Sequence, residues 1–177
     1  HTLAALPKVA QHIHLPVQSG SSRLLKDMRR GYSAESFMDL IARVRRILPT
    51  HGLSTDVIVG YPGETDEDFE ATMSLMRAVE FDSAFMFIYS ERDGTYAARQ
   101  RPDDVPMTVK KARIKALIDQ QEAISKVRYT KQIGRTVQVM VQGVSRRDEN
   151  QMIGRTSDFK TTIIPKGLGE PGDIIDV

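Results

Sequence analysis

The stretch HIHLPVQSGS, residues 12–21, decides the expected fold. It belongs to an apolar run that predicts a β-strand over residues 9–17, which Pro16 ends or places at a sheet edge. The run then enters a turn of small residues that contains Gln18 and Ser19. A strand that delivers a polar cluster at its end is typical of α/β proteins, whose active sites lie at the carboxyl ends of the strands.

The next residues predict further strands and helices in alternation. They indicate a short helix over 23–30, a helix over 34–48 capped by Ser33, a strand over 53–59, a helix capped by Thr65 or Asp66, and a strand over 83–89. The VIV run at 57–59 is typical of a strand buried on both faces. Such alternation predicts a parallel sheet with right-handed crossovers. Three strands are too few for a closed barrel, so one edge of the sheet is expected to stay unpaired. Because an unpaired edge can pair with a second copy of the chain, self-association is a hypothesis.

The second half of the chain has a different pattern. Residues 90–106 predict a loop, and a long helix is expected from Thr108, as its N-cap, to about Lys131. Its expected apolar face comprises Val109, Ala112, Ala116, Leu117, Ala123, Ile124 and Val127. After Gly134, short strands are expected in TVQVMVQGVS, QMIGRT and KTTIIP, with a fourth possible over 173–177. We therefore expect an α/β domain over residues 1–133 and a small antiparallel β-barrel over 134–177.

Composition and charge restrict the class of protein. The 177 residues include no cysteine, which excludes disulfides and any iron–sulfur cluster bound by this chain. No apolar run is long enough to span a membrane, and a cytoplasmic location is expected. Residues 107–177 carry 13 Lys/Arg against 8 Asp/Glu, whereas residues 1–106 carry 12 against 15. A basic second half favours an anionic partner such as RNA, although a solvated basic face is the alternative.

Polar residues follow each strand of the first half. Asp56 lies inside an apolar strand, where a carboxylate is costly unless it is paired. It is a candidate to bind sugar hydroxyls, with a structural role as the alternative. The turn at 60–65 is rich in glycine and allows a ligand to approach the backbone, but a plain turn explains it equally. His12 and His14 share a strand face without an obvious third metal ligand.

Four motifs in order carry a resemblance to a known family. HLPVQSGS, LLKDMRRGYS, STDVIVGYPGET and FIYSERDGT together resemble the radical S-adenosylmethionine (SAM) methylthiotransferases, most closely the MiaB type that acts on dimethylallyladenosine in tRNA. GRTVQVMVQGVSRRDENQMIGRT resembles the TRAM domain, an RNA-binding module at the end of those enzymes. The resemblance implies the C-terminal half of a partial TIM-type barrel followed by TRAM, with a TRAM domain that is one strand short at its end as the alternative to a complete one.

The resemblance also implies site residues. In this family a glutamine after the fourth strand, an arginine twelve residues later and an aspartate on the fifth strand contact SAM, and Gln18, Arg30 and Asp56 match them. Arg30 would pair with the methionyl carboxylate, and Asp56 would accept hydrogen bonds from the ribose hydroxyls. The further expected cofactor contacts are Ser19, Ile58, Gly60, Phe87 and Tyr89. The expected RNA contacts are Arg92, Ser145, Arg146, Arg147, Arg155 and Lys160.

The chain also departs from the family. The cysteine loop that holds the 4Fe-4S cluster is absent, so the fragment alone is expected to be inactive. Phe159 and Lys160 stand where the family usually has Asn-Arg. The expected reaction of the full enzyme adds a methylthio group to C2 of N6-dimethylallyladenosine beside the anticodon, with the anticodon stem-loop and an electron donor as partners. The alternatives are a methylthiotransferase for threonylcarbamoyl-adenosine or a ribosomal protein, or a stand-alone RNA-binding protein.

Overall fold

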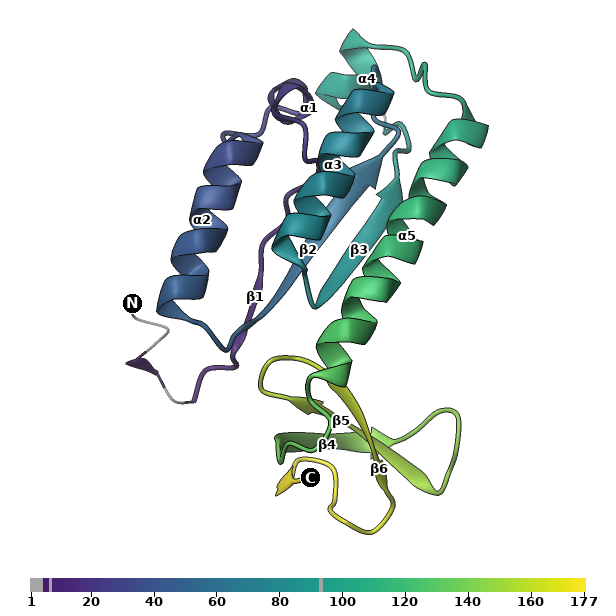
Figure 1. Cartoon of the computed structure of the whole chain (residues 1–177). Helices are drawn as coiled ribbons and strands as arrows, with labels where there is room; N and C mark the ends of the chain where they lie inside the picture. Colours follow the sequence, from purple (N-terminus) through teal and green to yellow (C-terminus); the bar gives the residue numbers. More distant parts are fainter. Residues whose placement is uncertain (1–4, 7, 93) are drawn as a thin grey trace.

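The computed structural model describes residues 5–6, 8–92 and 94–177, and Figure 1 shows two sheets joined by a long helix. The N-terminal sheet is parallel, with the order β1-β2-β3. Up to the end of the long helix, the elements are β1 (His12–His14), α1 (Ser22–Asp27), α2 (Ala34–Ile47), β2 (Gly52–Val59), α3 (Asp66–Val79), β3 (Ser83–Ile88), α4 (Tyr96–Gln100) and α5 (Met107–Thr130). The expected alternation of strands and helices in a parallel sheet is therefore confirmed.

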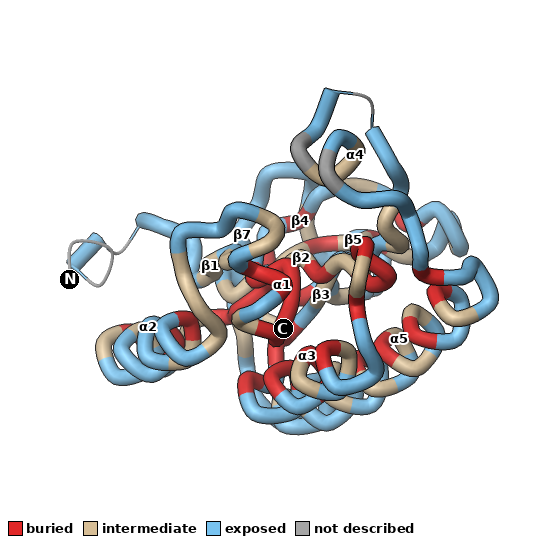
Figure 2. Tube along the Cα trace, turned by 90° about the horizontal axis from the view of Figure 1, so that it is seen from above, coloured by how far each residue is buried: buried red, intermediate tan, exposed pale blue. Residues whose placement is uncertain are grey.

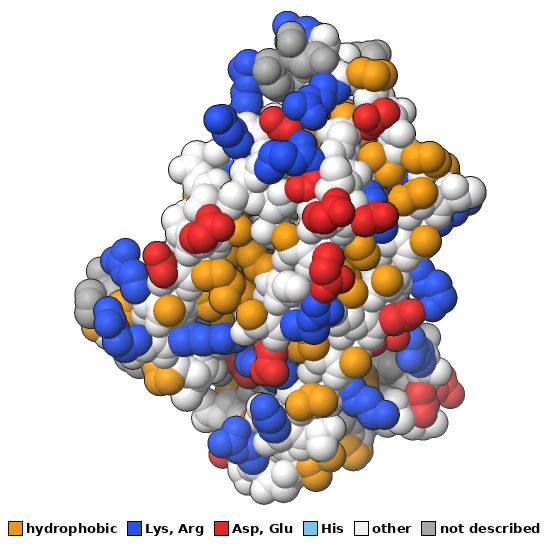
Figure 3. All heavy atoms as spheres, turned by 45° about the horizontal axis from the view of Figure 1, so that its top comes forward, with side chains coloured by type: hydrophobic (Ala, Val, Ile, Leu, Met, Phe, Trp, Pro, Cys, Tyr) orange, Lys and Arg blue, Asp and Glu red, His pale blue; other side chains and the backbone are white. Residues whose placement is uncertain are grey.

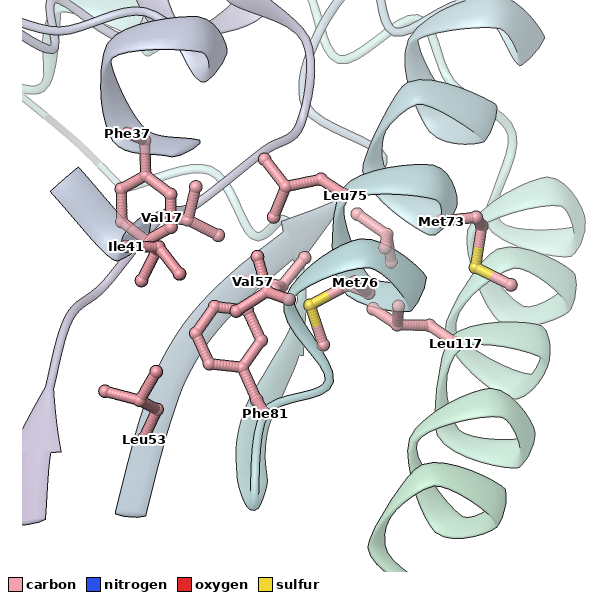
Figure 4. Close-up of a cluster of buried hydrophobic side chains, with 12 residues drawn as sticks. Val17, Phe37, Ile41, Leu53, Val57, Met73, Leu75, Met76, Phe81 and Leu117 are labelled. Atoms are coloured by element: carbon pink, nitrogen blue, oxygen red, sulfur yellow. The ribbon is translucent and has the colours of Figure 1, made fainter. Parts of the chain in front are cut away.

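Helices α2, α3 and α5 all cover one face of the N-terminal sheet. Figure 2 shows the buried residues concentrated between these helices and the strands. Figure 4 shows the core that results, to which β2 contributes Leu53 and Val57, and α3 contributes Met76. Phe81, in the turn before β3, is fully buried in the same cluster. Burying this apolar surface is the main stabilisation of the domain.

The opposite face of the N-terminal sheet carries no helix within the described residues. Phe85 and Phe87 on β3 are 57% and 52% exposed on this face. On β2, Val57 and Val59 are fully buried, whereas Ile58 between them is only half-buried. The expectation that the VIV run is buried on both faces was therefore wrong, because the strand faces the core on one side and an open surface on the other.

The first predicted strand and helix are both shorter than expected. β1 covers only His12–His14, because Pro16 lacks an N–H group and Gln18 has a φ of 69°. Two hydrogen bonds continue the pairing beyond it, from the N–H of Leu15 to the carbonyl of Ser54 (2.8 Å) and from the N–H of Gln18 to that of Asp56 (2.8 Å). Helix α1 ends at Asp27, before the predicted Arg30, because Arg29 adopts a φ of 58°.

The buried face of α5 differs from the predicted one. The buried residues are Lys110, Arg113, Leu117 and Gln121. Of the predicted apolar face, Leu117 is buried, whereas Val127 is 55% exposed. Polar side chains occupy the interior because distant groups pair with them: Gln121, for example, donates to the carbonyl of Phe81 at 2.9 Å. The helical periodicity of apolar residues carries no information about such partners, because they are distant in the sequence.

Two smaller predictions also need correction. The segment over 90–106, expected to be a loop, contains helix α4, which Thr95 caps by accepting from the N–H of Ala98 (3.3 Å). Helix α5 begins one residue before the predicted cap Thr108, with Pro106 at the cap position and no side-chain cap. Proline fits there because the first helical turn needs no N–H partner.

The C-terminal sheet is antiparallel, with the order β6-β5-β4-β7. Its strands are β4 (Gln138–Val144), β5 (Gln151–Thr156), β6 (Thr161–Pro165) and β7 (Ile174–Asp176). Val139 and Val141 alternate inward as predicted, and Val141 packs with Met152 and Ile164 in a small separate core. All four expected strands, including the possible last one, are therefore present.

Candidate functional site

A cavity of about 540 Å³ lies at the carboxyl ends of β1, β2 and β3. Parallel strands that end at one edge bring distant residues together, and ligands of open α/β sheets bind at such edges. The lining residues are Gln18, Asp27, Met28, Arg30, Asp56, Ile58, Tyr61, Phe87, Ile88, Tyr89, Ser90, Arg92, Thr95 and Ala97. Four separate chain segments therefore supply the walls of the cavity.

Gln18 occupies an unusual backbone conformation at this edge. Its φ of 69° lies in the left-handed region, which residues other than glycine seldom adopt. The conformation is held by pairing with β2, since the carbonyl of Gln18 accepts from the N–H of Ile58 at 2.9 Å. The Gln18 side chain lines the cavity and makes no hydrogen bond with any described residue. Strain beside an unpaired amide is characteristic of a binding site.

Asp56 supplies one of the two carboxylates that line the cavity. Its Oδ1 lies 3.4 Å from Nε2 of His14, and the other ring nitrogen of His14, Nδ1, lies 2.8 Å from Oγ of Ser54. Asp56 and Ser54 are on β2, while His14 is on the neighbouring β1. The open face of the sheet therefore positions the carboxylate beside the cavity, with a side-chain exposure of 28%. A carboxylate placed this way can accept hydrogen bonds from ligand hydroxyl groups.

Two guanidinium groups line the cavity without a partner among the described residues. Arg30 follows the left-handed turn that ends α1, and Arg92 follows β3. Neither side chain makes a hydrogen bond or ion pair within the described part of the chain. Figure 3 shows basic and acidic side chains interspersed over the surface around this end of the molecule. Unpaired arginines at a cavity are suited to bidentate recognition of a carboxylate or phosphate.

Aromatic rings form the apolar part of the cavity. The rings of Tyr61 and Tyr89 meet edge to face, with centroids 5.4 Å apart. Burial raises the pKa of the Tyr89 phenol, and its buried hydroxyl has no hydrogen-bond partner within the described residues. Phe87 lies two residues earlier, on β3, and is half exposed. Together these rings offer flat surfaces on which a planar heterocycle can stack.

Ion pairs of two buried cations, Arg113 and Lys110, support the loops near the cavity. Arg113 on α5 donates to Glu64 and to Asp66, each at 2.7 Å, and the N–H of Gly60 donates to Glu64 at 2.7 Å. Burial raises the pKa of Glu64, and Arg113 opposes that rise. Lys110 pairs with Asp103 at 2.6 Å and lies 5.1 Å from the centre of the Tyr89 ring. These pairs position the turn after β2 and the segment after β3.

The structure brings most of the predicted cofactor residues together. Gln18, Arg30, Asp56, Ile58, Phe87 and Tyr89 line the cavity, and so does Arg92, which was predicted to contact RNA. Ser19 is instead fully buried, with its hydroxyl 3.3 Å from that of Thr72, and Gly60 packs against Lys110. Sequence reasoning did not single out Tyr61 or Asp27, although Tyr61 lies in the glycine-rich turn that it did identify.

The predicted RNA-binding residues divide into two groups. Arg146 and Arg147 are exposed between β4 and β5, and Arg155 lies 4.2 Å from the centre of the Phe159 ring. Ser145 is buried and accepts from the N–H of Arg147 at 3.3 Å. Lys160 is 6% exposed and its ammonium group pairs with two aspartates, so it does not present a charge to solvent.

The residues present do not fit an iron–sulfur cluster. The chain has no cysteine, and the described residues contain no group of three or more His, Asp or Glu side chains arranged to hold a metal ion. His12 and His14 therefore have no third ligand in the described part of the chain. None of the helices that the structure describes is long and apolar enough to cross a membrane.

Comparison with protein families accounts for both sheets. The profile of the Radical SAM superfamily matches residues 1–76, and the profile of the TRAM domain matches residues 130–177. The chain is 48% identical over 175 residues to a tRNA-2-methylthio-N(6)-dimethylallyladenosine synthase of Phocaeicola vulgatus, covering 99% of the chain and 38% of that protein. A synthase of the same name from Chlorobaculum tepidum is 47% identical over 173 residues, covering 98% and 39%.

A solved structure supports the same fold. Coproporphyrinogen III oxidase from Escherichia coli, described as a Radical SAM enzyme, superposes with a TM-score of 0.54 at 16% identity, covering 84% of this chain and 39% of that one. This likeness concerns the fold alone. The chain spans about two fifths of the length of the curated relatives it matches. Its N-terminal part is therefore similar to the Radical SAM superfamily, and its C-terminal part is similar to TRAM domains.

Proposed function

We propose that this chain is the C-terminal part of a methylthiotransferase that modifies tRNA, and that its cavity binds SAM. The whole enzyme would add a methylthio group to C2 of N6-dimethylallyladenosine beside the anticodon. The observation that carries the proposal is the cavity itself. It combines two unpaired arginines, a carboxylate, an unpaired amide and aromatic rings in a chain whose relatives bear the name of that activity.

Each kind of group in the cavity suits one part of SAM. The guanidinium of Arg30 would bind the methionyl carboxylate through a charge-assisted pair. Asp56, held beside His14, would accept hydrogen bonds from the ribose hydroxyls. Phe87, Tyr89 and Ile58 would border the adenine, and the Gln18 amide would gain a partner from the ligand. Ser19 and Gly60 are left out of this contact set because they face the protein interior.

The chain supplies the binding groups but not the redox centre. Bound SAM supplies a source of radical chemistry when a reduced 4Fe-4S cluster is provided. Since the chain has no thiolate ligand, a cluster would have to be held by residues outside this chain, and the electron donor is a separate expected partner. What these residues do is bind SAM, orient it through its carboxylate and ribose, and exclude water from its adenine face.

The C-terminal sheet is the proposed RNA-binding part. Arg146 and Arg147 lie exposed on the turn between β4 and β5, without a side-chain partner among the described residues. Free arginines on a small β-domain attract the phosphate backbone and make the affinity depend on salt. The TRAM match and the name of the relatives favour tRNA over a ribosomal-protein substrate. A tRNA substrate also favours a cytoplasmic location.

Binding of SAM to the full-length protein tests the cavity. By isothermal titration calorimetry, Arg30→Ala is expected to raise the dissociation constant by about 10- to 100-fold, because a charged hydrogen bond of about 1.5–3 kcal/mol is lost. Asp56→Ala is expected to weaken binding as well. Arg43→Ala and Asp39→Ala are matched controls on exposed positions of α2 and should leave the affinity unchanged. Unchanged affinity in both cavity variants would refute the proposed SAM site.

Mass spectrometry of tRNA nucleosides tests the reaction. The full-length gene should restore the methylthio mass increase on dimethylallyladenosine in a bacterial strain that lacks this modification. If the modification appeared instead on threonylcarbamoyl-adenosine or on a ribosomal protein, the proposed substrate would be wrong while the SAM site would stand.

A further inference from the structure

A group of buried and partly buried charges joins the C-terminal sheet to the amino-terminal end of the parallel sheet. Asp82, the residue before β3, is 6% exposed and accepts from Nε of Arg128 at 2.7 Å and from the N–H of Leu53 at 2.9 Å. The ammonium group of Lys160, from the C-terminal sheet, lies 3.0 Å from Oδ1 of Asp82 and also pairs with Asp158. We call Asp82, Arg128, Asp158 and Lys160 the inter-sheet cluster.

The inter-sheet cluster is balanced and its partners come from separate parts of the chain. Two cations face two anions, contributed by the start of β3, the end of α5 and the turn between β5 and β6. Burial alone would raise the pKa of Asp82, but hydrogen bonds from Arg128, Leu53 and Lys160 outweigh it and hold the pKa below its usual range. Asp82 and Lys160 are buried, and Arg128 and Asp158 are partly exposed. Such a cluster selects one geometry, because another arrangement would leave the buried charge of Asp82 or Lys160 unpaired.

Two further contacts align the sheets at the same place. The ring of His12 on β1 stacks on the ring of Phe159, with centroids 4.7 Å apart and an interplanar angle of 23°. A Cβ atom added to Gly52, at the start of β2, would collide with the backbone carbonyl of Asp158. The backbones of the two sheets therefore approach so closely that only glycine fits.

We infer that Lys160 and Asp82 are positioning residues that fix the C-terminal sheet relative to the SAM cavity. This inference rests on the proposed function, because RNA held on the C-terminal sheet must place its target base at the opposite end of the parallel sheet. Sequence alone assigned Lys160 to RNA contact. The structure instead assigns its charge to Asp82 and Asp158, so its effect on the reaction passes through the geometry between the two parts.

The test uses the full-length protein and two independent readouts. Fluorophores introduced at the exposed positions Glu67 on α3 and Gln142 on β4 report the distance between the two parts by energy transfer. Lys160→Met is expected to broaden that distance distribution. It should also lower kcat for tRNA by about tenfold or more, since misplacement of a substrate is costly, while KM for tRNA changes by less than about twofold.

Conservative and matched variants separate positioning from general damage. Lys160→Arg keeps the charge and should restore both the narrow distribution and kcat. Lys166→Met removes an exposed lysine just after β6 and should change neither the distance nor kcat. If Lys160→Met proves too unstable, Phe159→Ala removes the ring stack without leaving a buried charge, and a smaller broadening is expected.

Two results would overturn or relocate the inference, and a third separates it from the proposed function. A higher KM with a weaker salt dependence and an unchanged distance would mean that Lys160 touches RNA directly. An unchanged distance together with an unchanged kcat would refute a positioning role. If the wild-type protein modified no tRNA, the proposed function would fail, yet the distance measurement would still show whether Lys160 fixes the C-terminal sheet.

Discussion

The polar side chains at the two ends of the parallel sheet differ in whether they have side-chain partners. At the carboxyl ends of the strands, Gln18, Arg30 and Arg92 line a cavity with no side-chain partner among the described residues. At the amino ends, Asp82 and Lys160 are almost fully buried and each has several partners. Buried polar groups are costly unless paired. Gln18 is buried without a side-chain partner in the described part of the chain and the two arginines are exposed, so the first end can receive a ligand, whereas the paired groups of the second end hold a fixed geometry.

The largest expected effect comes from breaking a buried ion pair. Arg113→Met leaves Glu64, whose side chain is 1% exposed, without its guanidinium partner. We expect a loss of about 3–5 kcal/mol in the free energy of unfolding, measured by urea denaturation. Arg77→Met removes an exposed ion pair with Glu70 and should cost much less, because solvent screens an exposed pair. Equal losses in the two variants would contradict the distinction between buried and exposed pairs.

Acid sensitivity provides a second test of the paired groups. Burial of Asp68 is outweighed by hydrogen bonds from Arg23, Ser21 and Thr65, so the pKa of this carboxyl lies well below its ordinary value of 3.8. A depressed folded-state pKa stabilises the protein above the ordinary value, and that stabilisation is lost as the pH falls through the acid range.

Asp68→Asn should therefore flatten this dependence. Between pH 4 and pH 2 the free energy of unfolding of the wild type should fall by about 1–2 kcal/mol more than that of the variant, because only the wild type has Asp68 to protonate. Solvent around the half-exposed Arg23 screens the pair and keeps the difference this small. The comparison is made by urea unfolding at each pH. Parallel curves for the two proteins would show that Asp68 does not carry the acid sensitivity.

A smaller effect of opposite sign is expected at the cavity. Gln18→Gly relieves the left-handed φ of 69° and should stabilise the chain by about 0.5 kcal/mol, while SAM binding weakens because the amide is lost. Thermal unfolding and calorimetric titration measure the two quantities. A destabilised variant would mean that the Gln18 side chain supports the fold rather than the ligand.

The smallest effect on stability is expected at Arg30. Because this guanidinium has no partner among the described residues, Arg30→Ala should change the free energy of unfolding by less than about 0.5 kcal/mol. The same urea titration measures it. A loss of more than about 1 kcal/mol in the free energy of unfolding would mean that Arg30 supports the fold, as the paired groups do.

Most of the fold could be predicted because its information is local. The apolar runs of β2 and β3, the caps at Ser33 and Thr65, and the alternation in β4 all depend on neighbouring residues. The buried face of α5 could not be predicted, because Lys110 and Arg113 are buried only through acidic partners elsewhere in the chain. The early end of α1 depends on a left-handed Arg29, which no sequence pattern announced.

The candidate site was predictable only in part. Asp56 could be predicted as a site residue because it is a carboxylate in an apolar strand, whereas Gln18 and Arg30 were predicted from resemblance to a family. Tyr61 was missed because its approach to Tyr89 requires the parallel pairing of β2 and β3. Lys160 was misplaced because charge alone does not distinguish a cation that faces solvent from one that faces a buried Asp82.

Helix α5 runs between the cavity end and the inter-sheet cluster end of the parallel sheet. Its length therefore limits which insertions and deletions the chain can accept. Lys110, next to Tyr89, and Arg128, bonded to Asp82, are separated by 18 residues, which at 3.6 residues per turn is five whole turns of about 27 Å. Inserting or deleting one residue between them would rotate Arg128 by about 100° away from its partner. Lineages of this protein are therefore expected to conserve the length of this segment even where its surface sequence drifts.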